Sequence, residues 1–281
     1  MKRSIRLGAV LVVILVTVVL VGARIQAWNP ATHIYIAQKV YPAYEGSPDL
    51  WYGAIAPDMA MYVPAGYSWD SAFWDTHWLA TDLRPWTRNS AQRVFARGWV
   101  THNEMYAADH YAHGYPPLYL AGYVTFRANL LAAAAKISPE LAHYAIETAV
   151  DLRLNTSRLY LAGHLMNVAA TPPPYVPGLL TRVFVWWPFQ RTDVQTLGAT
   201  QAYFNQVISA YAFALANSNL DNYEYIVDIG VLLAKQMGMP GSDVELEAQV
   251  RSLLAAALAL TADCEPAINL TIKAVSLSVP K

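Results

Sequence analysis

Two pairs of histidine and carboxylate side chains are spaced so that a helix would bring each pair to one face. His143 and Glu147 are four residues apart, as are Asp109 and His113, and His102 precedes Asp109 by seven residues, or two helical turns. Imidazole nitrogens and carboxylate oxygens on one face can bind a metal ion together. Ordinary polar contacts of a helix have the same spacing, so neither pair alone indicates a metal.

Three further candidate ligands lie nearer the N-terminus. His33 follows "WNPAT", Asp58 lies in the Gly/Pro-containing segment "GAIAPDM", and His77 lies in "FWDTHW". Each residue alone is also compatible with a satisfied core histidine or a loop-capping aspartate.

The segments that must position these side chains are predicted to be helices. Asn29 before Pro30 and Ser138 before Pro139 are typical helix starts, and Ser242 with Glu245 forms a capping-box pattern. No linker divides the chain, so the sequence predicts an all-α fold in a single multi-helix domain. Apolar residues recur at three- and four-residue spacing through 30–42, 90–113, 118–136, 139–169, 193–216, 221–238 and 243–261.

The segments between these helices are predicted to be long loops. Residues 44–88 and 171–191 carry Gly, Pro and Trp in an irregular pattern, and loops of that length usually form a site or a lid. The C-terminal segment 265–281 alternates enough to predict a short strand or an extended cover.

Composition excludes several classes of protein. The 281 residues are 55% apolar and only 14% charged, which excludes a disordered chain. A single cysteine, Cys264, excludes an intramolecular disulfide framework and cysteine-rich metal sites. The net charge of −1 argues against a broad electrostatic grip on duplex nucleic acid.

The N-terminal 27 residues are typical of an export signal. Lys2, Arg3 and Arg6 precede an apolar run over 7–23, and cleavage after Ala27 would make Trp28 the first residue. An uncleaved membrane anchor is the alternative. Removal of the segment leaves 15 basic and 20 acidic residues, a net charge of −5, and predicts a secreted or cell-envelope location.

The order of the candidate residues resembles the zinc-dependent phospholipase C family, whose superfamily includes the single-strand-specific zinc nucleases. In that superfamily the mature chain begins with a Trp whose amine and carbonyl bind zinc. A His in the first helix follows, and then an Asp and a His in loops. The last ligands are a His, an Asp and a His on one helix, and a His with an acidic residue four positions later on another. The residues that carry the resemblance lie within 28–151. The resemblance implies that residues 28–281 form one zinc-dependent phospholipase C-like helical domain. It implies as ligands of up to three zinc ions Trp28, His33, Asp58, His77, His102, Asp109, His113, His143 and Glu147.

The sequence departs from the family pattern around Asp109. The family commonly places the central His and Asp four residues apart, whereas His102 and Asp109 are seven apart. A shifted register in which Glu104 or His110 takes part is therefore an alternative. The segment "GAIAPD" and the Glu at position 147 favour the phospholipase branch, and the short spacing from Trp28 to the next His favours the nuclease branch.

The resemblance implies metal-assisted hydrolysis of a phosphate ester, with Asp58 also orienting or deprotonating the attacking water. The expected substrate is a phospholipid cleaved on the glycerol side of the phosphate, with contact to the membrane surface and no protein partner. Aromatic residues of the loops would contact the head group or stack a base, namely Tyr62, Tyr67, Trp69, Phe73 and Trp74. A nuclease or nucleotidase on the same scaffold and a non-catalytic, membrane-anchored helical protein are the alternatives.

Overall fold

The computed structural model describes residues 28–63, 72–78, 82–115, 120–184 and 193–279. These residues are almost entirely helical, and their one sheet is an antiparallel pair of two-residue strands, β1 (Gly114–Tyr115) and β2 (Leu120–Ala121). The predicted all-α class is confirmed. The predicted export signal, residues 1–27, lies outside the described part of the chain.

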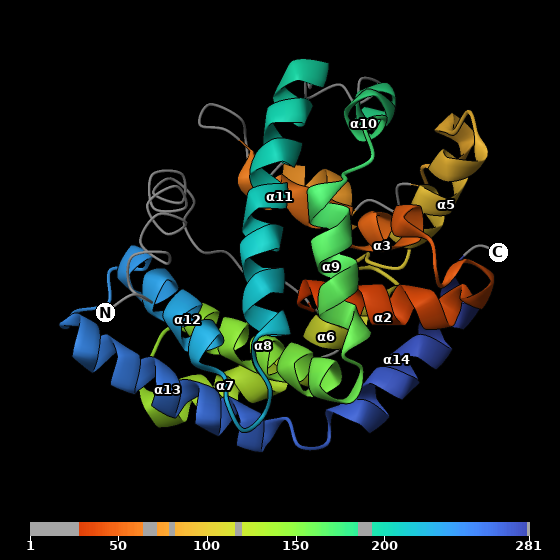
Figure 1. The fold of residues 1–281 in the computed structure, drawn as a ribbon. Helices are drawn as coiled ribbons and strands as arrows, with labels where there is room; N and C mark the ends of the chain where they lie inside the picture. The colour runs from red at the N-terminus through yellow and green to blue at the C-terminus, as the bar shows by residue number, and fades with distance from the viewer. Residues whose placement is uncertain (1–27, 64–71, 79–81, 116–119, 185–192, 280–281) are drawn as a thin grey trace.

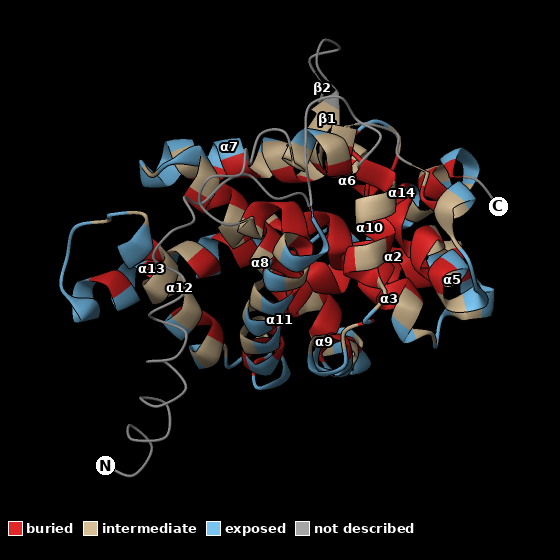
Figure 2. Cartoon of the chain, turned by 90° about the horizontal axis from the view of Figure 1, so that it is seen from above, coloured by how far each residue is buried: buried red, intermediate tan, exposed pale blue. Residues whose placement is uncertain are grey.

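The other helices pack around the two N-terminal helices, α2 and α3, which are mostly buried. In Figure 1, α9 and α11 run side by side through the middle of the molecule, α2 crosses at their lower ends, and α13 and α14 curve along the bottom. Figure 2 shows that α2 and α3 are buried over most of their length. The α-helices of the described residues are α2 (Pro30–Val40), α3 (Pro48–Ile55), α5 (Ser90–Trp99), α6 (Ala108–His113), α7 (Tyr123–Ala135), α8 (Pro139–Ser157), α9 (Tyr160–Ala170), α10 (Val176–Phe184), α11 (Val194–Ala216), α12 (Glu224–Gln236), α13 (Asp243–Leu260) and α14 (Cys264–Ser278).

Helix starts agree with the capping residues read from the sequence. Ser138 accepts a hydrogen bond from the backbone N–H of Leu141 at the start of α8. Ser242 and Glu245 form the reciprocal capping box of α13. Local side-chain chemistry therefore sets both of these boundaries.

Several predicted boundaries are wrong. The helix predicted over 90–113 is broken between α5 and α6, and the one over 139–169 is broken between α8 and α9. The predicted loop 44–88 contains α3 and three short helical turns, η3 (Ala56–Tyr62), η4 (Trp74–Trp78) and η5 (Arg84–Trp86), and the predicted loop 171–191 contains α10.

The C-terminal segment was predicted to be extended but forms α14. Its buried residues Cys264, Ile268, Thr271 and Val275 recur every three or four positions, which is the period of a helix and not of a strand. The alternation seen in the sequence arises from apolar residues that lie on the exposed side of this helix, such as Leu270 and Leu277.

Among the described helices, none is by itself both long and apolar enough to cross a membrane. One pair bent by 64°, α13 with α14, meets the length and composition requirement jointly.

Helices α3 and α5 cross with their backbones in close contact. A Cβ atom added to Gly53 would lie 2.1 Å from the carbonyl oxygen of Phe95, and one added to Gly98 would lie 2.2 Å from that of Leu50. Asp58 follows α3 and His102 follows α5, so this crossing sets the separation of two candidate ligands.

We expect Gly98→Ala to lower the free energy of unfolding by about 1–3 kcal/mol, because the added methyl group forces the two helix backbones apart. Gly163→Ala is the matched control, since a Cβ there meets nothing within 4 Å and alanine favours a helix. Urea unfolding of both variants gives the comparison. Equal stability of Gly98→Ala and the wild type would contradict the close crossing.

Candidate metal centre

Eight of the nine predicted ligands form three groups whose potential ligand atoms lie within 4.8 Å of one another. The first group is His33, His102 and Asp109, the second is Asp58, His77 and His102, and the third is His113, His143 and Glu147. Side chains from α2, η3, η4, the turn after α5, α6 and α8 contribute to them. All except His113 are buried.

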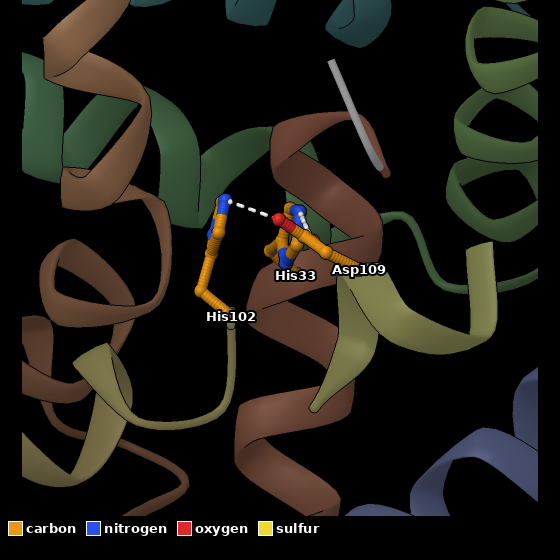
Figure 3. A group of neighbouring side chains, drawn as sticks. All are labelled: His33, His102 and Asp109. Carbon is orange, nitrogen blue, oxygen red and sulfur yellow. Dashed lines mark ion pairs between the residues drawn. The ribbon is translucent and has the colours of Figure 1, made fainter. Parts of the chain in front are cut away.

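Asp109 lies between the first two groups. Its Oδ1 is 3.4 Å from His33 Nε2, and its Oδ2 is 3.1 Å from His102 Nε2 and 3.9 Å from His77 Nε2. The rings of His33 and His102 stack with 3.8 Å between centroids, and Figure 3 shows the Asp109 carboxylate beside them, paired with both. Oδ1 thus faces His33 of the first group, whereas Oδ2 faces His77 of the second group and His102, which belongs to both. A carboxylate that bridges two ions would be arranged in this way.

In the second group, a hydrogen bond at Nδ1 orients each of the two histidine rings. His102 Nδ1 lies 2.8 Å from the carbonyl oxygen of Ala54, which can only accept, so Nδ1 carries the proton. Thr76 Oγ1 lies 2.9 Å from the carbonyl oxygen of Ala72 and 2.7 Å from Nδ1 of His77. Because that hydroxyl donates to Ala72, it accepts from His77 Nδ1. When both rings are neutral, as metal binding requires, the lone pair of each is then on Nε2.

The two Nε2 atoms of this group face each other and the same carboxylate. They are 3.2 Å apart, and Asp58 Oδ1 lies 3.5 Å from that of His77 and 3.4 Å from that of His102. Lone pairs that converge in this way repel one another unless a cation lies between them.

The third group is built mainly by α8. His143 Nε2 lies 2.9 Å from Glu147 Oε1 one turn later, and 3.2 Å from His113 Nε2 at the end of α6. The four-residue spacing predicted for His143 and Glu147 is confirmed as one helix face.

These residues fit metal ions. Two ligands at the tetrahedral angle lie about 3.4 Å apart when each bond to the ion is about 2.1 Å, which matches the separations above. Several of the atoms are buried without a hydrogen-bond partner, which is rare unless something else binds them. They are both ring nitrogens of His33, Oδ1 of Asp58, both oxygens of Asp109 and both oxygens of Glu147.

Burial and the neighbouring carboxylates make it costly to ionise some of the acidic side chains of these groups. Burial, and then the charges of Asp58 and Asp109, hold the pKa of Glu147 well above its ordinary value, and burial raises the pKa of Asp109 to about 6. For Asp58, burial alone would raise the pKa, but the opposing charge of a protonated His102 lowers it. A concentration of buried carboxylates with these shifts is typical of a site that binds cations.

The start of α2 is fixed by α8. Asp151, one turn beyond Glu147, accepts hydrogen bonds from the backbone N–H groups of Ala31 (3.0 Å) and Thr32 (2.8 Å). It also accepts from the hydroxyl groups of Thr32 (2.6 Å) and Tyr211 (3.0 Å). Asn29 makes no side-chain cap, so Asp151 caps α2 from another helix and fixes the residue before His33.

Trp28 is fully buried beside Asp109. Its indole N–H donates to the carbonyl oxygen of Ala108 at 3.0 Å, and its ring stacks on Tyr123 with 5.8 Å between centroids. The structure thus places Trp28 next to a ligand of the first group. Its predicted part as a ligand through a terminal amine and carbonyl stays a prediction.

The predicted stripe of His102, Asp109 and His113 on one helix is wrong. His102 lies in the turn after α5, and Asp109 and His113, at opposite ends of α6, belong to different groups. The alternative register predicts Glu104 or His110 as a metal ligand. The side chain of Glu104 contacts His113, but Glu104 belongs to none of the three groups. His110 also lies outside them.

The sequence analysis did not identify Asp151 as a residue that supports the site. The four-residue spacing of His143, Glu147 and Asp151 could have indicated that all three lie on one face of α8.

The fold and the site together define an all-helical protein with buried His/Asp/Glu groups that could hold metal ions. No family model, no curated protein and no solved structure matches the chain.

Proposed function

We propose that the protein is a zinc-dependent hydrolase of phosphate esters with a multinuclear centre. The observation that carries the proposal is the Asp109 carboxylate, with Oδ1 toward His33 and Oδ2 toward His102. Hydrolases with two neighbouring ions use a bridging carboxylate in this way, and the ions supply a water of lowered pKa and bind the phosphate oxygens. Mixed imidazole and carboxylate ligands suit zinc.

The chain's own residues have distinct parts in this proposal. His77, His102, Asp58 and Asp109 hold one ion, and His33 holds a second with Asp109 and the terminal amine and carbonyl of Trp28. The third ion is held by His113, His143 and Glu147. Asp58 also orients or deprotonates the attacking water.

The side chains around His77 favour a phospholipid as the substrate. Phe73 stacks on the His77 ring at 3.9 Å, and Trp74, which is 54% exposed, stacks on Trp78 at 5.6 Å. Met105 is 45% exposed and follows Glu104, whose backbone N–H donates to the carbonyl oxygen of His77. Exposed tryptophan and methionine suit a lipid interface.

A single-strand nuclease or nucleotidase is the second candidate, because stacked tryptophans also bind nucleobases. The predicted aromatic residues Tyr67 and Trp69 lie outside the described residues. An acidic net charge of −5 for residues 28–281 favours the lipid over the nucleic acid.

We infer export from the basic residues Lys2, Arg3 and Arg6 and the apolar run over 7–23. The part proposed for Trp28 also requires cleavage after Ala27. N-terminal sequencing of the purified protein tests this directly. A retained segment would leave Trp28 without a free amine and favour the anchored, non-catalytic alternative.

The function is tested by elemental analysis of the purified protein, followed by assays on phosphatidylcholine vesicles and on single-stranded DNA at low salt. Two or three zinc ions per chain with release of phosphocholine would support the proposal. Cleavage of DNA alone would support the nuclease alternative, and a protein without bound metal would overturn both.

We expect His143→Ala to lower the zinc content by about one ion per chain and to lower activity with it, because the third group loses its central ligand. Far-UV circular dichroism should stay unchanged. His164→Ala is the control, since His164 on α9 stacks on Trp51 away from the three groups. Full activity of His143→Ala would contradict the site.

A further inference from the structure

Glu104 is a buried carboxylate beside the third group that the proposed ligand set does not use. It lies in the turn between α5 and α6 and is 4% exposed. Its Oε1 is 2.6 Å from Nδ1 of His113, and its backbone N–H donates to the carbonyl oxygen of His77 at 2.9 Å. One residue therefore contacts a ligand of the third group through its side chain and a ligand of the second through its backbone.

The contact with His113 determines which ring nitrogen faces the group. A carboxylate accepts the Nδ1 proton, so the lone pair of His113 is on Nε2, which lies 3.2 Å from Nε2 of His143. A ligand histidine whose other nitrogen donates to a carboxylate is held in one tautomer and made a stronger ligand.

The other oriented histidines have neutral partners. His102 donates to the carbonyl oxygen of Ala54, and His77 donates to the hydroxyl group of Thr76. Of these three rings, only that of His113 has a carboxylate at its Nδ1. It is also the one partly exposed ligand, so water competes with its orientation more than with that of the buried rings.

We propose that Glu104 is a positioning residue that orients His113 and strengthens metal binding at the third group. The inference rests on the proposed metal centre and extends it to a residue outside the ligand set. Glu104 acts through His113 and not as a ligand.

The test compares Glu104→Ala and Glu104→Gln with the exposed control Glu45→Gln. Zinc affinity is measured by competition with chelators of graded strength, and the cobalt-substituted proteins are compared by visible absorption. We expect Glu104→Ala to weaken one ion about 10- to 100-fold and to change the cobalt spectrum. Glu104→Gln keeps an oxygen acceptor without the charge, so its affinity should be intermediate. Glu45→Gln should match the wild type.

The controls separate a positioning role from a structural one. Chelator-treated Glu104→Gln should unfold at the wild-type temperature, since the side-chain shape is kept, and it carries the test if Glu104→Ala does not fold. Unchanged affinity in both Glu104 variants would overturn the inference. Loss of an ion that saturating zinc does not restore would also overturn it, because Glu104 would then be a ligand. A wild-type protein that binds no ion would instead refute the proposed metal centre.

Discussion

We expect Asp109→Asn to bind at least one ion fewer than the wild type and to lose about 1000-fold or more of its hydrolytic activity. Asp109 Oδ1 lies 3.4 Å from Nε2 of His33 in the first group. Its Oδ2 lies 3.9 Å from Nε2 of His77 in the second group and 3.1 Å from that of His102, which belongs to both. An amide offers one oxygen and one NH₂ group, and the NH₂ group has no lone pair for a metal ion. In either orientation, one group loses its shared ligand.

The fold should survive this substitution. Asn has nearly the same shape as Asp, and burial already raises the pKa of Asp109 to about 6, so the metal-free protein bears a cost for its charge. Chelator-treated Asp109→Asn should therefore unfold at or above the wild-type temperature, while the rise in that temperature on adding zinc should be smaller.

Elemental analysis and thermal unfolding with and without zinc give both quantities, and Asp221→Asn, an exposed aspartate, is the control. Wild-type stoichiometry in Asp109→Asn would show that Asp109 does not bridge two ions.

Local sequence patterns predicted the parts of the site that local geometry determines. His143 and Glu147 lie within α8, whose start is set by Ser138, so their common face follows from helix geometry alone. The resemblance implied nine ligands, and eight of them lie in the three groups, whereas the part of Trp28 as a ligand stays a prediction.

The sequence did not reveal the break between α5 and α6, because contacts distant in sequence hold it. The segment's residues look helical in isolation, yet the backbone of Glu104 pairs with His77, 27 positions earlier, and His102 Nδ1 reaches Ala54, 48 positions earlier. Hence the single stripe predicted for His102, Asp109 and His113 is divided between groups. Tertiary hydrogen bonds overrode an apolar period that continues through the break.

We expect Asp151→Ala to lower the free energy of unfolding by about 3 kcal/mol or more, because it leaves several buried donors without an acceptor. Those donors are the N–H groups of Ala31 and Thr32 and the hydroxyl groups of Thr32 and Tyr211. The first turn of α2 has no cap of its own, since the Asn29 amide donates instead to Thr148 and Tyr211.

The size of the effect can be divided between these bonds by matched variants. Tyr211→Phe removes one donor to Asp151 and one of the two acceptors of the Asn29 amide, which keeps its bond to Thr148, so it should cost about 1–2 kcal/mol. Asp151→Asn keeps one oxygen acceptor and should lie between Tyr211→Phe and Asp151→Ala. Urea unfolding of the chelator-treated proteins gives these values. Because Thr32 precedes His33, the ion held by His33 should also bind more weakly in Asp151→Ala, whereas the third ion, held by α6 and α8, should be less affected. A loss of stability without this selective loss of metal would mean that Asp151 fastens α2 to α8 but does not set the position of His33.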